Sequence, residues 1–263
     1  EVFRYTKSKG LKIILMPLDC LTIEKVLDKM FLPDYLDLHS ISFYDLQLLK
    51  LIKKTKIPLI LALGGRTGDE LIEKIDYFGN QIYCIMVGFQ SFPTKFDDII
   101  IEKINTLKSL YGEIHIGYAD HSQYDDSSMI VNNEYALKLG ATVFEKHITI
   151  EEGIERIDYI SAINKNKFSK LVDILKKSKT ADYKFLDIDL DYLAPSEIKY
   201  RNREKYAVAA KKLNKGEVIN CNNISYKLID KGLVGYNQND AIPNLKLNTD
   251  VEYDDIILQE HFI

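Results

Sequence analysis

The amino-acid sequence predicts an α/β fold, and its hydrophobic pattern supports that class in two ways. From residue 11 to about residue 180, short apolar runs rich in β-branched residues alternate with longer segments whose apolar residues recur at helical spacing. Runs of this kind, separated by helices, are typical of parallel strands that are covered on both faces. The regular repeat favours a (β/α) TIM-type barrel over an open doubly wound sheet, although periodicity alone leaves both arrangements open.

The expected elements follow one another in a simple order. Six strands are predicted at residues 11–16, 35–39, 57–63, 82–89, 114–118 and 141–148. Helices are predicted between and after them at residues 22–31, 44–54, 68–78, 98–111, 126–139 and 164–178. The barrel domain is therefore expected to span residues 1–179.

The pattern changes after Lys179. Residues 180–199 alternate acidic with apolar side chains and contain a proline, which predicts a linker lying along the barrel. From residue 200 to residue 263 the sequence has short strand-like pieces separated by turn residues, among them Asn214-Lys215-Gly216. This part is predicted to be a small, mainly β domain.

Composition excludes several classes of protein. The chain has 263 residues, a net charge of −4 and 46% hydrophobic residues, which argues against a non-specific nucleic-acid binder and against disorder. No apolar run reaches the roughly 18 to 20 residues of a membrane helix. The three cysteines, Cys20, Cys84 and Cys221, do not have the spacing of a metal-binding or redox motif. No export signal is apparent, so a reducing, cytoplasmic environment is expected.

Two histidines stand at the ends of neighbouring predicted strands. Because side chains two apart share a face of a strand, His121 shares one with Ala119, and His147 shares one with Glu145. Imidazoles in such positions bind a divalent metal, and Asp120 and Glu145 are candidates to orient them through hydrogen bonds. The alternative is a pair of partly buried histidines that bond backbone carbonyls, and the residues alone leave both open.

Two further strand ends are candidate substrate sites. The Gly-rich corner from Ala62 to Gly68 contains Gly64 and Arg66 and leads into a predicted helix, so its backbone N–H groups and the arginine suit a phosphate or carboxylate. Ser91 follows the next strand and offers a hydroxyl. An ordinary strand-to-helix turn, for the first stretch, and a loop, for the second, are the simpler interpretations.

Several of these motifs together resemble one family, the sialic acid synthases and their relatives that make legionaminic, pseudaminic and spore-coat sugar acids. The similar pieces are IGYADH, ATVFEKHIT, ILALGGRT and the stretch QSFPT at residues 90–94. The tail KYAVAAKKLNKGEVINCNNISYKL resembles the family's C-terminal SAF domain, which is related to type III antifreeze protein. The resemblance covers nearly the whole chain in order.

The resemblance implies a reaction and a set of residues. The reaction is the Mn²⁺- or Mg²⁺-assisted condensation of phosphoenolpyruvate with the aldehyde of an N-acyl sugar, in a domain-swapped homodimer. His121 and His147 match the family's metal ligands. The candidate catalytic residues are Asp120, Glu145 and Lys146, and the resemblance adds Ser40, Asp158 and Lys227 to the substrate-binding candidates Gly64, Arg66 and Ser91.

The sequence also departs from the family. The family barrel has eight strands, and its first two have no counterpart among the six predicted here. Asp37 stands at the position of a phosphate-binding lysine, which inverts the charge there, and smaller or apolar residues replace other phosphate ligands at Ala62, Val87 and Ala119. Three hypotheses stay open: an active synthase, a non-catalytic homologue acting as a binding or regulatory subunit, and a metal-dependent barrel acting on an unphosphorylated partner.

Overall fold

The computed structural model describes most of the chain. The described residues are 1–88, 93–95, 98–178, 188–201, 203, 205–220, 222–229, 235–238 and 245–262. The chain divides into two compact units, Glu1–Ile57 with Asn202–Ile263, and Pro58–Arg201. Each unit is described by itself.

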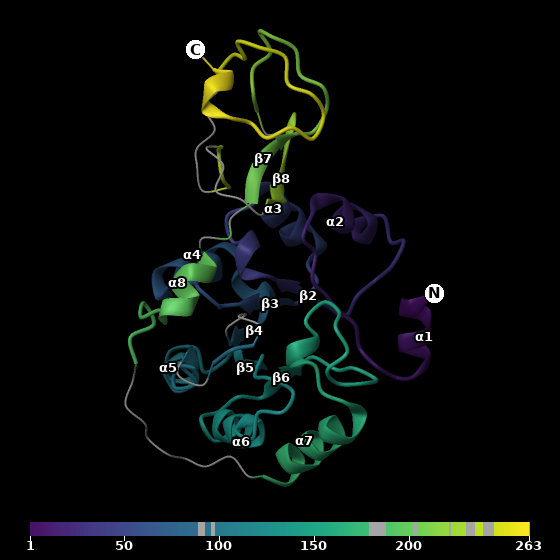
Figure 1. Ribbon diagram of the computed structural model, residues 1–263, viewed down its shortest axis with the longest axis vertical. Coiled ribbons are helices and arrows are strands. Elements are labelled where there is room, and N and C mark those ends of the chain that lie inside the picture. Colours follow the sequence, from purple (N-terminus) through teal and green to yellow (C-terminus); the bar gives the residue numbers. More distant parts are fainter. Residues whose placement is uncertain are drawn as a thin grey trace. The chain divides into compact units, whose positions relative to one another are not determined.

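The unit Pro58–Arg201 contains four parallel strands that pair in chain order (Figure 1). The strands are β3 (Leu59–Ala62), β4 (Ile82–Val87), β5 (His115–Asp120) and β6 (Val143–Lys146). The helices are α4 (Gly68–Phe78), α5 (Lys103–Leu110), α6 (Met129–Lys138), α7 (Lys165–Lys177) and α8 (Pro195–Arg201), with 3-10 turns at Gly79–Gln81 and Tyr159–Ser161. This arrangement confirms the α/β class and the parallel sheet.

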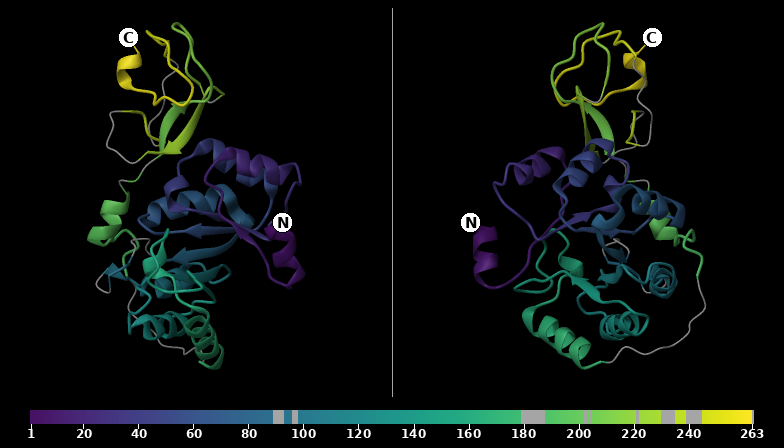
Figure 2. Two further views of the ribbon diagram at one scale, coloured as in Figure 1. Left: turned by 45° about the vertical axis from the view of Figure 1, so that its right-hand side comes forward. Right: turned by 180° about the vertical axis from the view of Figure 1, so that it is seen from behind.

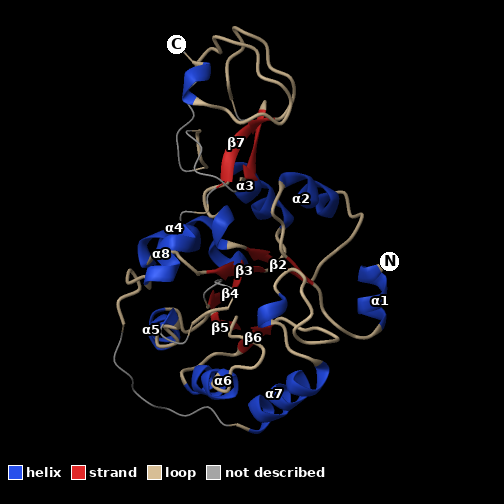
Figure 3. Ribbon diagram, viewed as in Figure 1, coloured by secondary structure: helices blue, strands red, loops and turns tan. Residues whose placement is uncertain are grey.

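Helices α5 and α6 pack against β5, and α7 packs beside α6 (Figure 3). On β4 and β5 almost every side chain is buried, which agrees with the continuous apolar runs of the sequence. One close contact requires a glycine. Gly88 has φ +147°, and a Cβ there would lie 2.3 Å from the carbonyl oxygen of Ala119. The glycine therefore lets the end of β4 approach the end of β5.

The other unit joins the first part of the chain to the last part. The first part contains α1 (Val2–Ser8), β1 (Ile14–Leu15), α2 (Cys20–Leu27), β2 (Tyr35–Leu38), a 3-10 turn (Ser40–Ser42) and α3 (Leu46–Thr55), and β1 pairs with β2 in parallel. The last part contains the antiparallel strands β7 (Lys205–Ala209) and β8 (Ile224–Leu228) and a 3-10 turn at Gln259–His261.

The C-terminal residues form a small β module with its own core. Figure 2 shows β7 beside β8, with the last residues of the chain in yellow folding over the same module. Isolated bridges such as Val208 to Ile256 replace longer strands. The predicted turn is confirmed, because Glu217 N donates to Asn214 O at 3.0 Å and Gly216 takes φ +90°. The buried core residues are Ala207, Ala209, Leu213, Ile219, Ile224, Leu247, Val251 and Ile257.

Buried polar contacts hold this module to the first part of the chain within the same unit. The ammonium of Lys205, at the start of β7, donates to the carbonyl oxygen of Leu18 at 2.7 Å and to Asp45 Oδ2 at 2.9 Å. Asp45 also caps α3 by accepting a hydrogen bond from Leu48 N. Both charged side chains are buried, and their mutual attraction offsets the cost of removing each charge from water.

The six predicted strands and six predicted helices correspond to β1–β6 and to α2–α7, with ends that differ by a few residues; Phe89 lies outside the described residues. Among the described residues, two α-helices were not predicted. α1 precedes the first strand, and α8 begins inside the predicted linker, where Pro195 occupies its first position, and ends two residues beyond it. In the part of the chain that the structure describes, no helix has the length and apolarity to cross a membrane.

Candidate functional site

Three side chains that suit a metal ion meet at the carboxyl ends of β5 and β6. His121 directly follows β5, Glu145 lies in β6 and His147 directly follows β6. One ligand atom from each lies within 4.8 Å of the others. His121 Nε2 is 3.6 Å from Glu145 Oε1, and the two imidazole rings have centroids 5.2 Å apart.

The strand register explains why these residues meet. Ala119 pairs with Glu145 in the parallel ladder, so the residues that follow continue side by side on the same face. The predicted approach of His121 and His147 is therefore confirmed, and Glu145 joins them as a third donor. The strand pattern placed Glu145 on the correct face, but it was expected to orient a histidine or to act in catalysis, not to be a third metal donor.

Burial keeps the two imidazoles neutral. Burial, together with the neighbouring His147, lowers the pKa of His121 to about 3. Burial also lowers the pKa of His147, against the opposing charge of Asp158, and it raises the pKa of Glu145. Neutral imidazoles offer lone pairs at neutral pH, and a bound cation would favour the charged form of Glu145.

The donor chemistry bears on the metal. Two imidazole nitrogens and one carboxylate suit Mn²⁺ and other divalent transition ions, whereas Mg²⁺ prefers oxygen ligands and retained water. The residues present therefore fit a divalent transition-metal ion better than Mg²⁺.

Asp120 and Lys146 lie on the opposite face of the same two strands. Lys146 Nζ is 3.2 Å from Asp120 Oδ1 and donates to the carbonyl oxygen of Ser122 at 2.8 Å. Asn133 of α6 donates to Asp120 Oδ2 at 2.7 Å. This ion pair is buried, and it ties β5 to β6 and α6. Two of the three predicted catalytic residues, Asp120 and Lys146, thus pair with each other, whereas the third, Glu145, belongs to the metal-ligand group.

The Gly-rich corner between β3 and α4 is covered. Glu197 of α8 accepts a hydrogen bond from Gly65 N at 3.2 Å, and Asp191 accepts one from Gly68 N at 2.8 Å. Arg66 is buried and contacts Glu70 at 3.2 Å. Carboxylates of the chain itself therefore accept hydrogen bonds from the N–H groups of Gly65 and Gly68, and both Gly64 and Arg66 are buried.

The remaining predicted site residues are Asp158, Ser40, Lys227 and Ser91. Asp158 has φ +58° and lies near enough to His147 to oppose the lowering of that histidine's pKa. Ser40 is buried at the start of a 3-10 turn, and Lys227 on β8 pairs with Asp254 at 2.5 Å; both belong to the other unit. Ser91 lies outside the described residues.

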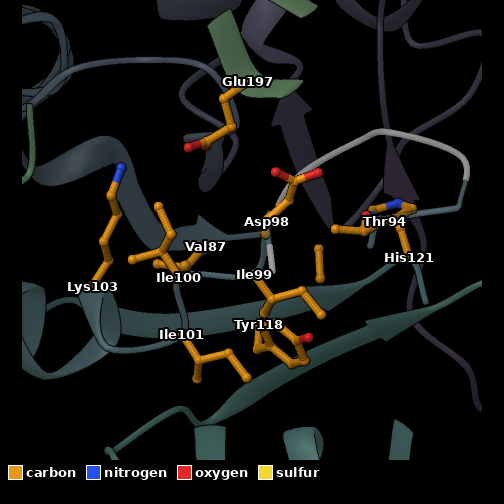
Figure 4. Close-up of a pocket in the computed structure, with 12 residues that line it drawn as sticks. Val87, Thr94, Asp98, Ile99, Ile100, Ile101, Lys103, Tyr118, His121 and Glu197 are labelled. Carbon is orange, nitrogen blue, oxygen red and sulfur yellow. The ribbon is translucent and has the colours of Figure 1, made fainter. Parts of the chain in front are cut away.

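A small cavity adjoins His121, and nothing in the sequence predicted it. Its volume is about 20 Å³, which is room for about one water molecule. Figure 4 shows Thr94 and His121 at one end, and Lys103 and Glu197 at the other. Burial lowers the pKa of Lys103, although Glu197 opposes that shift. The sequence does not indicate that this lysine is buried, because a lysine at the start of an amphipathic helix is usually exposed.

Comparisons with known proteins agree on the type of protein. The model of the NeuB family matches residues 1–184. An uncharacterized protein of Methanocaldococcus jannaschii is 29% identical over 266 residues, covering 98% of this chain and 74% of that protein. A pseudaminic acid synthase of Campylobacter jejuni is 26% identical over 267 residues, covering 100% of this chain and 74% of that protein.

Solved structures share the fold. The crystal structure of a spore coat polysaccharide biosynthesis protein of Bacillus subtilis has a TM-score of 0.77 at 20% identity, covering 100% of this chain and 76% of that chain. A truncated 3-deoxy-D-arabino-heptulosonate 7-phosphate synthase of Thermotoga maritima has a TM-score of 0.58 at 17% identity, with 67% and 68% covered. At these identities the likeness concerns the fold alone.

Proposed function

This chain belongs to the NeuB family, and on that premise we propose that it condenses phosphoenolpyruvate with the aldehyde of an N-acyl sugar to give a sialic-type acid and phosphate. The observation that carries the proposal is the group of His121, Glu145 and His147 at the carboxyl ends of parallel strands. Active sites in barrel enzymes lie at these strand ends. The name of the Campylobacter jejuni relative, a pseudaminic acid synthase, supports the same class of product.

His121, His147 and Glu145 would hold the divalent metal, with Mn²⁺ favoured by their donor atoms. When bound, the metal supplies Lewis-acid polarisation of the aldehyde oxygen. The chain's own residues prepare the site. The low pKa values of both histidines keep their lone pairs available, and the buried pair of Asp120 and Lys146 fixes the two strands that carry the ligands.

The chemistry balances without a redox partner. Carbon 3 of phosphoenolpyruvate forms a bond to the aldehyde carbon, whose oxygen becomes a hydroxyl after taking a proton. Water adds at carbon 2, and phosphate leaves as the bond from that carbon to the phosphate oxygen breaks. Asp158, beside His147, is proposed to contact the sugar, together with Ser40 and Lys227.

The wider arrangement is part of the same proposal. The parallel strands are proposed to belong to a TIM-type barrel, and the C-terminal β module to be an SAF domain. A domain-swapped homodimer in the cytoplasm is proposed for the assembly. The parallel strands support the barrel, and the separate core of the C-terminal module supports the β domain.

Phosphate release tests the function directly. The protein is incubated with Mn²⁺, phosphoenolpyruvate and a panel of N-acyl hexosamines, alongside His121→Ala and the control His115→Ala, whose exposed imidazole contacts Thr142. Release that the first variant abolishes and the second retains would support the synthase. Absence of release with every sugar would contradict it.

A second candidate function is a non-catalytic subunit of the same family. Asp37 is buried, with 5% of its surface exposed, where the resemblance implies a cation for phosphate. Ala62 and Ala119 are also buried and offer no hydroxyl. Losing several phosphate partners together weakens phosphate binding strongly. Bound Mn²⁺ without phosphate release would favour this candidate over the first.

A further inference from the structure

One short segment, residues 159–163, contacts the backbone of both histidines of the metal-ligand group. The hydroxyl of Ser161 donates to the carbonyl oxygen of His121 at 2.8 Å. Two residues later, Ile163 N donates to the carbonyl oxygen of His147 at 2.9 Å. Ser161 and Ile163 are fully buried. Both histidines lie just beyond the ends of their strands, where the sheet ladder no longer holds them.

The same segment is bonded to the residues that follow each histidine. Tyr124 N, three residues after His121, donates to Ile160 O at 2.8 Å. Thr149 N, two residues after His147, donates to Ile163 O at 2.9 Å, and Ile148 forms a parallel bridge with Ile163. Residues 159–163, a 3-10 turn followed by the bridge at Ile163, therefore span the gap between the two loops.

From these contacts we infer that Ser161 is a positioning residue for the metal-ligand group. Its hydroxyl joins the His121 loop to the segment that holds His147, over a separation of 40 residues in sequence. The carbonyl oxygen of His121 also accepts Thr94 N at 3.0 Å, so loss of the hydroxyl loosens the loop without leaving that oxygen unbonded. The imidazole of His121 then moves relative to Glu145 and His147.

The inference rests on the proposed function in one respect, namely that the group binds a divalent cation. It goes beyond that function by giving Ser161 a role. Ser161 touches neither substrate nor metal, and it acts only through the backbone of His121. Such outer contacts orient ligands, and changing them typically lowers metal affinity by about 10- to 100-fold.

The test compares Ser161→Ala with Thr106→Val in the full chain. Thr106 is a matched control, because its buried hydroxyl also donates to a distant backbone carbonyl, that of Ile188 at 3.2 Å, but on α5 rather than beside either histidine. Mn²⁺ affinity is measured by electron paramagnetic resonance, and ligand geometry by the visible spectrum of bound Co²⁺. We expect Ser161→Ala to weaken Mn²⁺ binding about tenfold and to change the Co²⁺ spectrum, while Thr106→Val changes neither.

Equal Mn²⁺ affinity and Co²⁺ spectra for Ser161→Ala and the unmodified protein would overturn the inference. Equal losses in both variants would also overturn it, because they would reflect general destabilisation. If the unmodified protein binds neither ion, the metal part of the proposed function fails, and amide exchange of the metal-free protein decides the inference instead. Faster exchange at Tyr124 and Ile163 in Ser161→Ala alone would support the positioning role, and unchanged exchange would refute it.

Discussion

Replacing Lys205 by methionine removes the cation from the buried pair that joins β7 to the loop before α3. Lys205 Nζ makes two hydrogen bonds, to Leu18 O at 2.7 Å and to Asp45 Oδ2 at 2.9 Å. Hydrogen bonds to charged groups contribute about 1.5 to 3 kcal/mol each, so their loss amounts to about 3 to 6 kcal/mol. A second estimate of the same loss agrees with this range: removing one partner of a buried ion pair destabilises a protein by about 3 to 5 kcal/mol, because the other charge is left uncompensated.

The free energy of unfolding from urea titrations measures this loss. The matched control is Lys227→Met, which breaks the pair with Asp254 on the surface, where about half of each side chain is exposed; pairs of this kind contribute about 0 to 1 kcal/mol. The double variant Lys205→Met with Asp45→Asn is expected to recover part of the stability, because the orphaned charge is removed. A loss for Lys205→Met no larger than that for Lys227→Met would refute the reasoning.

Three other predictions concern the site, a cysteine and a glycine. Glu145→Gln is expected to weaken Mn²⁺ binding by at least about tenfold, measured by electron paramagnetic resonance, whereas Glu155→Gln on an exposed loop leaves it unchanged. Burial, followed by the charge of Asp45, raises the pKa of the Cys20 thiol to about 12. In a variant with Cys84 and Cys221 replaced by alanine, Cys20 is therefore expected to react with iodoacetamide at pH 8 at least about tenfold more slowly than free cysteine. Its reaction rate is expected to rise with pH up to that pKa. Equal rates for Cys20 and free cysteine at pH 8 would contradict the burial of the thiol. Gly88→Ala is expected to lower the free energy of unfolding, measured by urea titration, by more than about 2 kcal/mol, because the new Cβ would lie 2.3 Å from Ala119 O. The control Gly112→Ala is expected to leave this free energy nearly unchanged, because its Cβ would meet only Lys108 O at 3.6 Å.

The order of β1–β6 and of α2–α7, and the approach of the two histidines, follow from local pattern. Apolar runs predicted β1–β6, and the central strands β3, β4 and β5 bury nearly every side chain on both faces. His121 and His147 were expected to meet, because parallel neighbours end at the same edge of a sheet. The period of two along a strand placed Glu145 on the face of His147, whereas Asp120 and Lys146, predicted to be catalytic, pair with each other.

The groups that those side chains contact depend instead on how distant segments pack together. The hydrogen bond from Gly65 N to Glu197, the burial of Lys103 and the bond from Ser161 to His121 each depend on residues that are distant in sequence. Local pattern carries no information about such contacts, because they arise where loops and α8 pack over the strand ends. For the same reason Arg66 looked like an anion ligand in the sequence, yet it lies buried against Glu70.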